Sequence, residues 1–163
     1  MKPSLTAPDR LMPGRFVWLM ELYEENFQRL ERVFGTSRLV PDRYLSSVGD
    51  GLDVVLDVLE RQAHTTEIRL SYALVDPGTG LATPSAVLKI YRDARLAEAT
   101  HCLPGRQLVD VLGAHAAPRR VLDHRMRMNS FLSRWLDYLA EHGHSWHTLT
   151  IADQESQESR AEG

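Results

Sequence analysis

Residues 52–74 read LDVVLDVLERQAHTTEIRLSYAL, and this stretch decides the fold. In its first part, apolar residues at positions 52, 54, 56 and 58 alternate with Asp53 and Asp57. Its second part alternates Ile68, Leu70 and Tyr72 with polar residues. A period of two predicts β-strands, and the first of these should be half-buried on one face. A connection of hairpin length between the two strands predicts antiparallel pairing, because parallel pairs need long crossovers.

Further strands are expected on both sides of this pair. The run Asp76-Pro77-Gly78-Thr79-Gly80 is a strong turn signal. Short runs at 87–91 and 96–101 follow it and are joined across residues 92–95. Residues 44–48 predict one additional edge strand before Gly49-Asp50-Gly51. The sequence therefore predicts a meander of four or five antiparallel strands.

Two amphipathic helices are expected to flank this sheet. After Pro13, apolar residues recur at spacings of four and three, at Phe16, Met20, Tyr23, Phe27, Leu30 and Phe34. Gly35 follows at the position of a C-terminal cap. Near the other end, a second apolar stripe predicts a helix that stops at Gly143; its members are Val121, Met128, Leu132, Trp135 and Leu139. We expect Trp135 to pack against the sheet. The predicted class is α+β, because two such helices can cover one face of a single sheet.

Length and composition indicate one domain. The chain has 163 residues, 43% of them hydrophobic, and a net charge of −3. We expect an N-terminal arm at 1–12, a domain at 13–147 and a polar tail at 148–163. The tail has four acids against one arginine from Asp153 onward, and this composition is typical of disorder.

The same features predict a cytoplasmic protein with no membrane segment. The apolar run from Phe16 to Met20 is too short for an export signal, and no stretch approaches the length of a membrane span. Cys102 is the single cysteine, so an internal disulfide is excluded, which fits a reducing compartment. His101, as the next residue of a strand, points to the opposite face and is badly placed to act as the base of this thiol. We therefore expect the thiol to be buried or neutral.

The sequence contains none of the standard catalytic or phosphate-binding motifs. His142, His144 and His147 lie within six residues, but Gly143 interrupts the helix among them. No metal and no cofactor are therefore predicted. A basic stretch at Arg119, Arg120, Arg125 and Arg127 could bind an anion, since arginine matches phosphate through paired hydrogen bonds. The alternative for this stretch is a solvated helix face.

Three segments resemble a proteobacterial family of unknown function, the YqiB-like proteins. They are Asn26-Phe27-x-x-Leu30, the segment from Tyr91 to Glu98, and the segment from Asp123 to Leu136, which is followed by His142-Gly143. The resemblance extends over roughly residues 15–145. Two positions depart from the family pattern. His124 stands where the family has Glu, and Arg125 stands where it has Lys.

The resemblance points to a polar cluster made of Tyr91, Asp93, Glu98, Arg125 and Asn129. If the helix packs near the hairpin, Arg125 should lie close to Glu98 or Asp93. The cluster is either a structural network or a small polar pocket.

Three functions follow from these features. The first is a non-catalytic binding or adaptor module that engages a protein or a small ligand. The alternative is a regulator that binds nucleic acid or a nucleotide through the basic stretch, a less favoured reading because the chain is acidic. The third is an enzyme that uses Asp93 and Glu98 as an acid–base pair.

Overall fold

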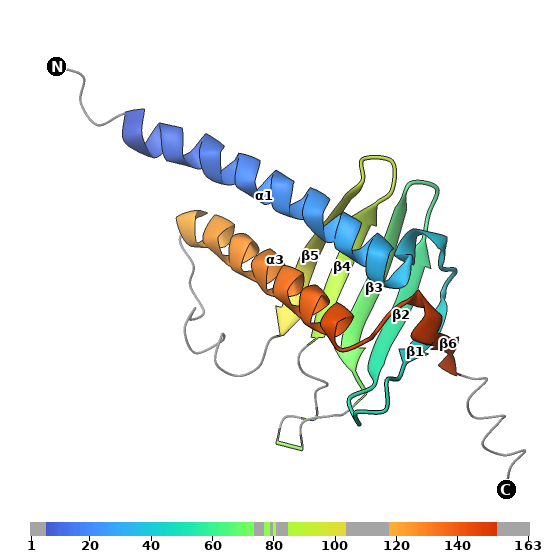
Figure 1. The fold of residues 1–163 in the computed structure, drawn as a ribbon. Coiled ribbons are helices and arrows are strands. Elements are labelled where there is room, and N and C mark those ends of the chain that lie inside the picture. Colours follow the sequence, from blue (N-terminus) through green and yellow to red (C-terminus); the bar gives the residue numbers. More distant parts are fainter. Residues whose placement is uncertain (1–5, 74–76, 79, 81–84, 104–117, 153–163) are drawn as a thin grey trace, which may run out of the picture.

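In the part of the chain that the structure describes, the fold is one antiparallel sheet with two long helices on one of its faces (Figure 1). A computed structural model describes residues 6–73, 77–78, 80, 85–103 and 118–152, with the backbone alone for 6–13, 15, 103 and 118–121. The helices are α1 (Thr6–Phe34) and α3 (Pro118–Glu141), and the short 3-10 turns are η1 (Thr36–Arg38) and η2 (Trp146–Thr148). The strands are β1 (Asp42–Ser46), β2 (Val54–Arg61), β3 (Thr65–Tyr72), β4 (Ser85–Tyr91), β5 (Leu96–Leu103) and β6 (Leu149–Ile151).

The sheet has the order β5-β4-β3-β2-β1-β6, and every neighbouring pair is antiparallel. The predicted meander is confirmed for β1 to β5. The predicted number of strands is wrong, because β6 adds a sixth strand beside β1. Residues 149–151 were expected in the polar tail, and three residues are too few to show a period. The strand at 44–48 was expected at an edge, but β1 lies between β2 and β6.

Helices α1 and α3 run side by side in the same direction across one face of the sheet (Figure 1). Helix α1 begins at Thr6. Pro13 was predicted to lie in the first turn of the helix, and it lies inside the helix instead. A proline inside a helix removes one backbone hydrogen bond, and here it does not end the helix. The first turns of α1 project beyond β5, and Phe16 is therefore 58% exposed although it belongs to the predicted buried stripe.

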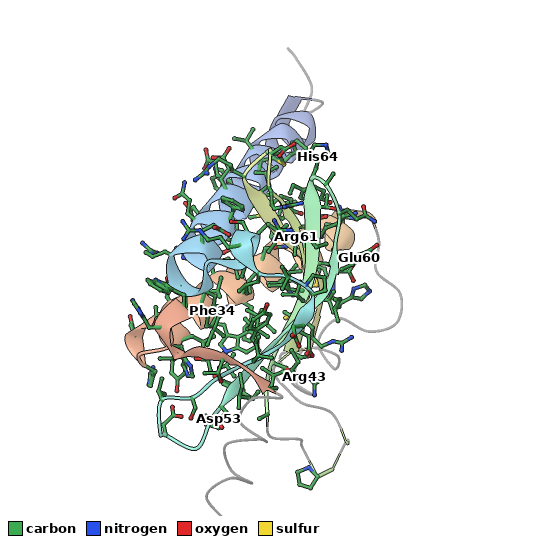
Figure 2. The ribbon with its side chains drawn as sticks, turned by 90° about the vertical axis from the view of Figure 1, so that its right-hand side faces the viewer. Phe34, Arg43, Asp53, Glu60, Arg61 and His64 are labelled. Carbon is green, nitrogen blue, oxygen red and sulfur yellow. The ribbon has the colours of Figure 1, made fainter. Side chains whose placement is uncertain are left out.

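The core lies between the helices and the sheet. The rest of the α1 stripe from Tyr23 to Phe34 is buried, as are Leu132, Trp135 and Leu139 of α3. On β2 the residues from Val54 to Val58 are all buried, so the prediction of a strand buried on one face alone is wrong there. Asp57 points to the outer face, where the Arg43 guanidinium covers it with bonds of 2.7 and 3.1 Å. Figure 2 shows the sheet from the edge that carries β1 and β6 and labels Arg43.

The end of the β2–β3 hairpin carries exposed polar groups. His64 lies at its tip, and Arg61 donates a hydrogen bond to the carbonyl of Leu39 at 2.9 Å (Figure 2). This bond ties the hairpin to the segment that follows α1. Within the described ranges, no helix is both long and apolar enough to cross a membrane.

Candidate functional site

A carboxylate and two phenols meet where α1 lies over the β4–β5 hairpin. The hydroxyl of Tyr91 on β4 donates to Oε1 of Glu98 on β5 at 2.7 Å. Tyr23 of α1 lies near the same carboxylate, which raises the pKa of its phenol. Burial and the Glu98 carboxylate raise the pKa of both Tyr23 and Tyr91 to about 12. Both phenols therefore stay protonated at neutral pH and can donate to Glu98.

Asn129 of α3 satisfies the outer edge of the sheet. Strand β5 is last in the sheet order, so some of its backbone N–H groups face away from β4. The side-chain oxygen of Asn129, which is fully buried, accepts from the N–H of Ala99 at 2.7 Å. Its amide nitrogen donates to the carbonyl of Arg125 at 2.9 Å. Asn129 therefore anchors α3 to β5, as a buried amide must be hydrogen-bonded.

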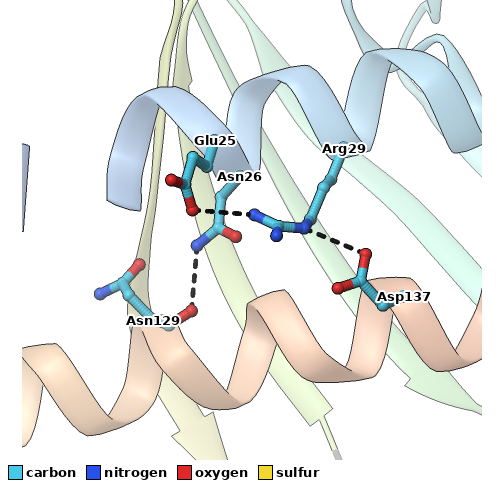
Figure 3. Close-up of polar contacts among 5 residues, drawn as sticks. All are labelled: Glu25, Asn26, Arg29, Asn129 and Asp137. Carbon is cyan, nitrogen blue, oxygen red and sulfur yellow. Dashed lines mark hydrogen bonds and ion pairs between the residues drawn. The ribbon is translucent and has the colours of Figure 1, made fainter. Parts of the chain in front are cut away.

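Asn26 joins the two helices at the same level (Figure 3). Its amide nitrogen donates to the backbone carbonyl of Asn129 at 3.0 Å, and the residue is fully buried. One turn further along, Arg29 bonds Glu25 at 3.3 Å and Asp137 at 3.1 Å. Sequence reasoning did not assign Asn26 to the cluster. The only signal was its place in the Asn-Phe-x-x-Leu segment that resembles the family.

The structure places Asp93 away from these residues. Asp93 lies in the β4–β5 turn, is exposed, and contacts Nδ1 of His64 at the tip of the neighbouring hairpin. The backbone N–H of Arg92 donates to the His64 carbonyl at 2.9 Å, which holds the two turns together. Asp93 therefore belongs to a contact between two turns, and Glu98 belongs to the contact between α1 and β5.

Among the described residues, Arg125 and Arg127 form no ion pair with the cluster. Arg125 and Arg127 are exposed on α3. Within the described part of the chain, Arg125 forms no ion pair within 4.0 Å of Glu98 or Asp93. The charge of Arg125 nevertheless lowers the pKa of Tyr23, although burial and Glu98 raise that pKa by more. The side chains of Arg119 and Arg120 lie outside the described residues.

A groove of about 890 Å³ runs around the C-terminal end of α1. One wall is a stripe of α1 that includes Gln28, Glu31 and Arg32, at spacings of three and four residues. The opposite wall comes from Trp146 of η2 and from β6. Sequence reasoning missed this groove, because its walls come from segments more than a hundred residues apart.

The groove is positively charged although the whole chain is acidic. Arg32, Arg38 and Arg95 line it, and none of them forms an ion pair with a described carboxylate. Glu31 is the acid in the lining, and its oxygens accept from Thr36 Oγ1 at 3.1 Å and from the N–H and hydroxyl of Ser37 at 2.7 and 2.6 Å. The Glu31 carboxylate therefore stabilises the turn after α1, and the three guanidinium groups remain available to a ligand.

The three histidines near the end of α3 have separate surroundings. His142 bonds the Tyr138 carbonyl through Nδ1 at 2.8 Å, and His147 stacks on Trp146 with ring centroids 3.5 Å apart. His144 is buried and contacts the hydroxyl of Ser46 at 2.7 Å. Among the described residues, no group of three potential ligands is placed to hold a metal ion.

The hydrogen bonds around His144 indicate which ring nitrogen carries its proton. Thr148 Oγ1 donates to the Ser145 carbonyl at 2.8 Å, so Ser46 Oγ must donate to Thr148 Oγ1 at 2.6 Å. The contact between His144 Nδ1 and Ser46 Oγ then requires a proton on Nδ1. The bonds between His144, which follows α3, and Ser46 of β1 therefore need a proton on Nδ1.

Protonation of His144 should destabilise the fold. Burial lowers the pKa of His144 below 6.5, although Asp50 and Asp53 oppose this effect and His142 adds to it. Below about pH 6.5 the unfolded chain then binds more protons at this position than the folded chain does, so stability falls as pH falls. In urea denaturation between about pH 7.5 and 5.5, we expect a loss of at most about 1.4 kcal/mol per pH unit from this group.

The matched control for this pH dependence is His147→Gln, which removes an exposed imidazole. It should keep the pH dependence of wild type, whereas His144→Gln should reduce it. Equal slopes for the two variants would contradict the assignment to His144.

Cys102 of β5 is not suited to nucleophilic chemistry. Burial raises the pKa of its thiol to about 11. At neutral pH the thiol is therefore protonated, and the thiolate is the reactive form.

Comparison with known proteins identifies a family. A family model described as "Protein of unknown function (DUF1249)" matches residues 29–145, which include β1 to β5 and α3. Neither the curated proteins nor the solved structures provided a match. Because the matched region covers most of the chain, the protein belongs to the DUF1249 family, a family of unknown function.

Proposed function

We propose that the protein is a non-catalytic binding or adaptor module that holds a protein or a small ligand in the groove around the end of α1. The groove itself is the observation that supports this function. It combines three arginines with Trp146, which is 58% exposed, in a single concave surface. Sites of this kind, with apolar walls and a few convergent polar groups, are typical of ligand binding.

The contacts of the acidic residues favour binding over catalysis. Asp93 and Glu98, the two acids of the enzymatic alternative, have different partners on different elements. The phenol of Tyr91 donates to the Glu98 carboxylate and remains protonated at neutral pH. An acid–base pair made of these two carboxylates would need both of them to reach the same substrate. These contacts give each acid a structural role instead.

Within the family, we place the chain among the YqiB-like proteins, and we infer a cytoplasmic location. The segments from Tyr91 to Glu98 and from Asp123 to Leu136 support the narrower family name. Tyr91, Glu98 and Asn129 all take part in contacts that hold the hairpin and the helices together. The single cysteine with its neutral thiol is consistent with a reducing compartment.

The proposed function can be tested by capture from a lysate of the organism that makes the protein. Tagged wild type should retain at least one protein or small molecule that the double variant Trp146→Ala/Arg38→Glu loses, because both substitutions change the groove. Mass spectrometry of the eluted proteins and of the extracted small molecules measures both classes of ligand.

Arg134→Glu is the matched control, since Arg134 is exposed on α3 and does not line the groove. It makes the same charge change and should retain what wild type retains. Identical profiles for wild type and the groove variant would contradict a binding function at this site. Conversion of a captured substrate by the wild type would contradict a non-catalytic role.

A further inference from the structure

We infer that the groove binds an extended acidic peptide segment of a partner protein. This inference rests on the proposed function and specifies the class of its ligand. Four features of the groove support it: its length, its charge, the backbone of Arg95 and the nature of its apolar walls.

The groove is long in one direction. Arg95 lies in the turn between β4 and β5, whereas Ile151 belongs to β6 at the opposite end of the sheet. Four strand spacings separate β4 from β6 in the sheet order, and at about 4.8 Å each they correspond to about 19 Å. An extended peptide advances about 3.3 Å per residue, so about six residues fill this length. A compact ligand would contact one end alone.

The charge of the groove requires an anionic partner. Arg32 and Arg38 lie near its middle, at the end of α1 and in η1, and Arg95 lies at one end. The carbonyl end of a helix repels anions, and Arg32 in the last turn of α1 opposes this effect. Carboxylates spaced along a peptide can pair with the arginines one after another, since guanidinium and carboxylate groups match in geometry.

Arg95 has an unusual backbone conformation. Its φ is 56°, and among the described residues other than glycine it alone has a positive φ. Glycine adopts this conformation without strain, whereas other residues incur a cost. The guanidinium of Arg95 lies over the ring of Phe27, 5.0 Å from its centroid, which fixes it at the mouth of the groove. An arginine held in a strained turn at this place supports a role for its side chain in binding.

The apolar part of the lining favours a peptide over a nucleic acid. Leu39, Leu149 and Ile151 are aliphatic and partly buried, and they suit an apolar side chain of a peptide. Binding of single-stranded nucleic acid depends on aromatic faces for the bases. The ring of Tyr44 is buried, and Trp146 already stacks on His147. The groove therefore offers several aliphatic contacts and one aromatic surface.

Selection from a phage-displayed library of linear heptapeptides on the immobilised full-length protein tests this inference. We expect the selected peptides to be enriched in Asp and Glu around one apolar residue. Fluorescence anisotropy with the most enriched peptide should give a Kd that rises about tenfold for Arg38→Glu and rises with salt concentration, because opposite charges are lost. Arg134→Glu should leave the Kd unchanged. Circular dichroism of each variant checks that the fold is retained.

Two further probes distinguish the other ligands. Labelled oligouridylate should bind more weakly than the selected peptide, and a version of that peptide with Lys in place of each acid should not bind. The inference is wrong if the selected peptides show no excess of acids, if oligouridylate binds more tightly, or if Arg38→Glu leaves peptide binding unchanged. Capture in the lysate experiment that depends on the groove would still support the proposed function in each of these cases.

Discussion

Trp135→Ala should lower the free energy of unfolding by about 3–5 kcal/mol, a large share of the 5–15 kcal/mol typical of a domain. Trp135 of α3 is 5% exposed, and its ring meets the ring of Tyr72 edge-on at 5.6 Å. Its Nε1 donates to the Tyr72 hydroxyl at 3.1 Å. The substitution therefore leaves a cavity between α3 and the sheet and removes the partner of a half-buried phenol. Urea denaturation followed by circular dichroism measures the loss.

Trp146→Ala is the control for this prediction. Trp146 has the same side chain but is 58% exposed, so its removal should change stability by less than about 0.5 kcal/mol. A loss below about 1 kcal/mol for Trp135→Ala would mean that the apolar stripe of α3 does not pack on the sheet.

Asn129→Ala should lower the free energy of unfolding by about 1–3 kcal/mol, because it leaves the buried N–H of Ala99 without an acceptor. Asn129→Asp should be worse, although it keeps an acceptor oxygen. It places a charge in a fully buried position and removes the donor to the Arg125 carbonyl. Denaturation in urea at neutral pH measures both variants.

Arg134→Ala, on the exposed side of the same helix, serves as the control and should be nearly neutral. Hydrogen exchange adds a local measurement. The Ala99 amide should exchange faster in Asn129→Ala than in wild type, by more than the global loss of stability explains. An unchanged Ala99 amide would show that Asn129 does not protect this edge.

Local patterns were sufficient for the elements of the fold. The alternation at 52–74 predicted β2 and β3, and the stripe containing Trp135 predicted α3 and its buried face. These features depend on which face of a strand or helix is apolar, and a period of two or near 3.6 records that property within one segment. The same patterns failed at the ends of elements. Helix α1 begins before Pro13, and Phe16 is exposed because the helix is longer than the sheet that covers it.

Some polar contacts follow from one local segment, and others depend on segments far apart in the chain. Tyr91 and Glu98 lie seven residues apart on one hairpin, so their contact follows from local structure. Asn26, Asn129 and the backbone of Ala99 come together only because α1 and α3 pack side by side against β5. Asp93 pairs with His64 because two turns distant in sequence are neighbours in the sheet, and no property of either segment alone indicates this.

The sequence by itself determined an α+β chain with an antiparallel meander and two amphipathic helices, because hydrophobic periodicity is a local property. Only the tertiary structure decided where β6 pairs, which amide satisfies the edge of β5, and that Arg32, Arg38, Arg95 and Trp146 line one groove. Each of these depends on contacts between segments far apart in the chain. Such contacts are selected by the packing of the whole domain, and a short pattern of residues does not record them.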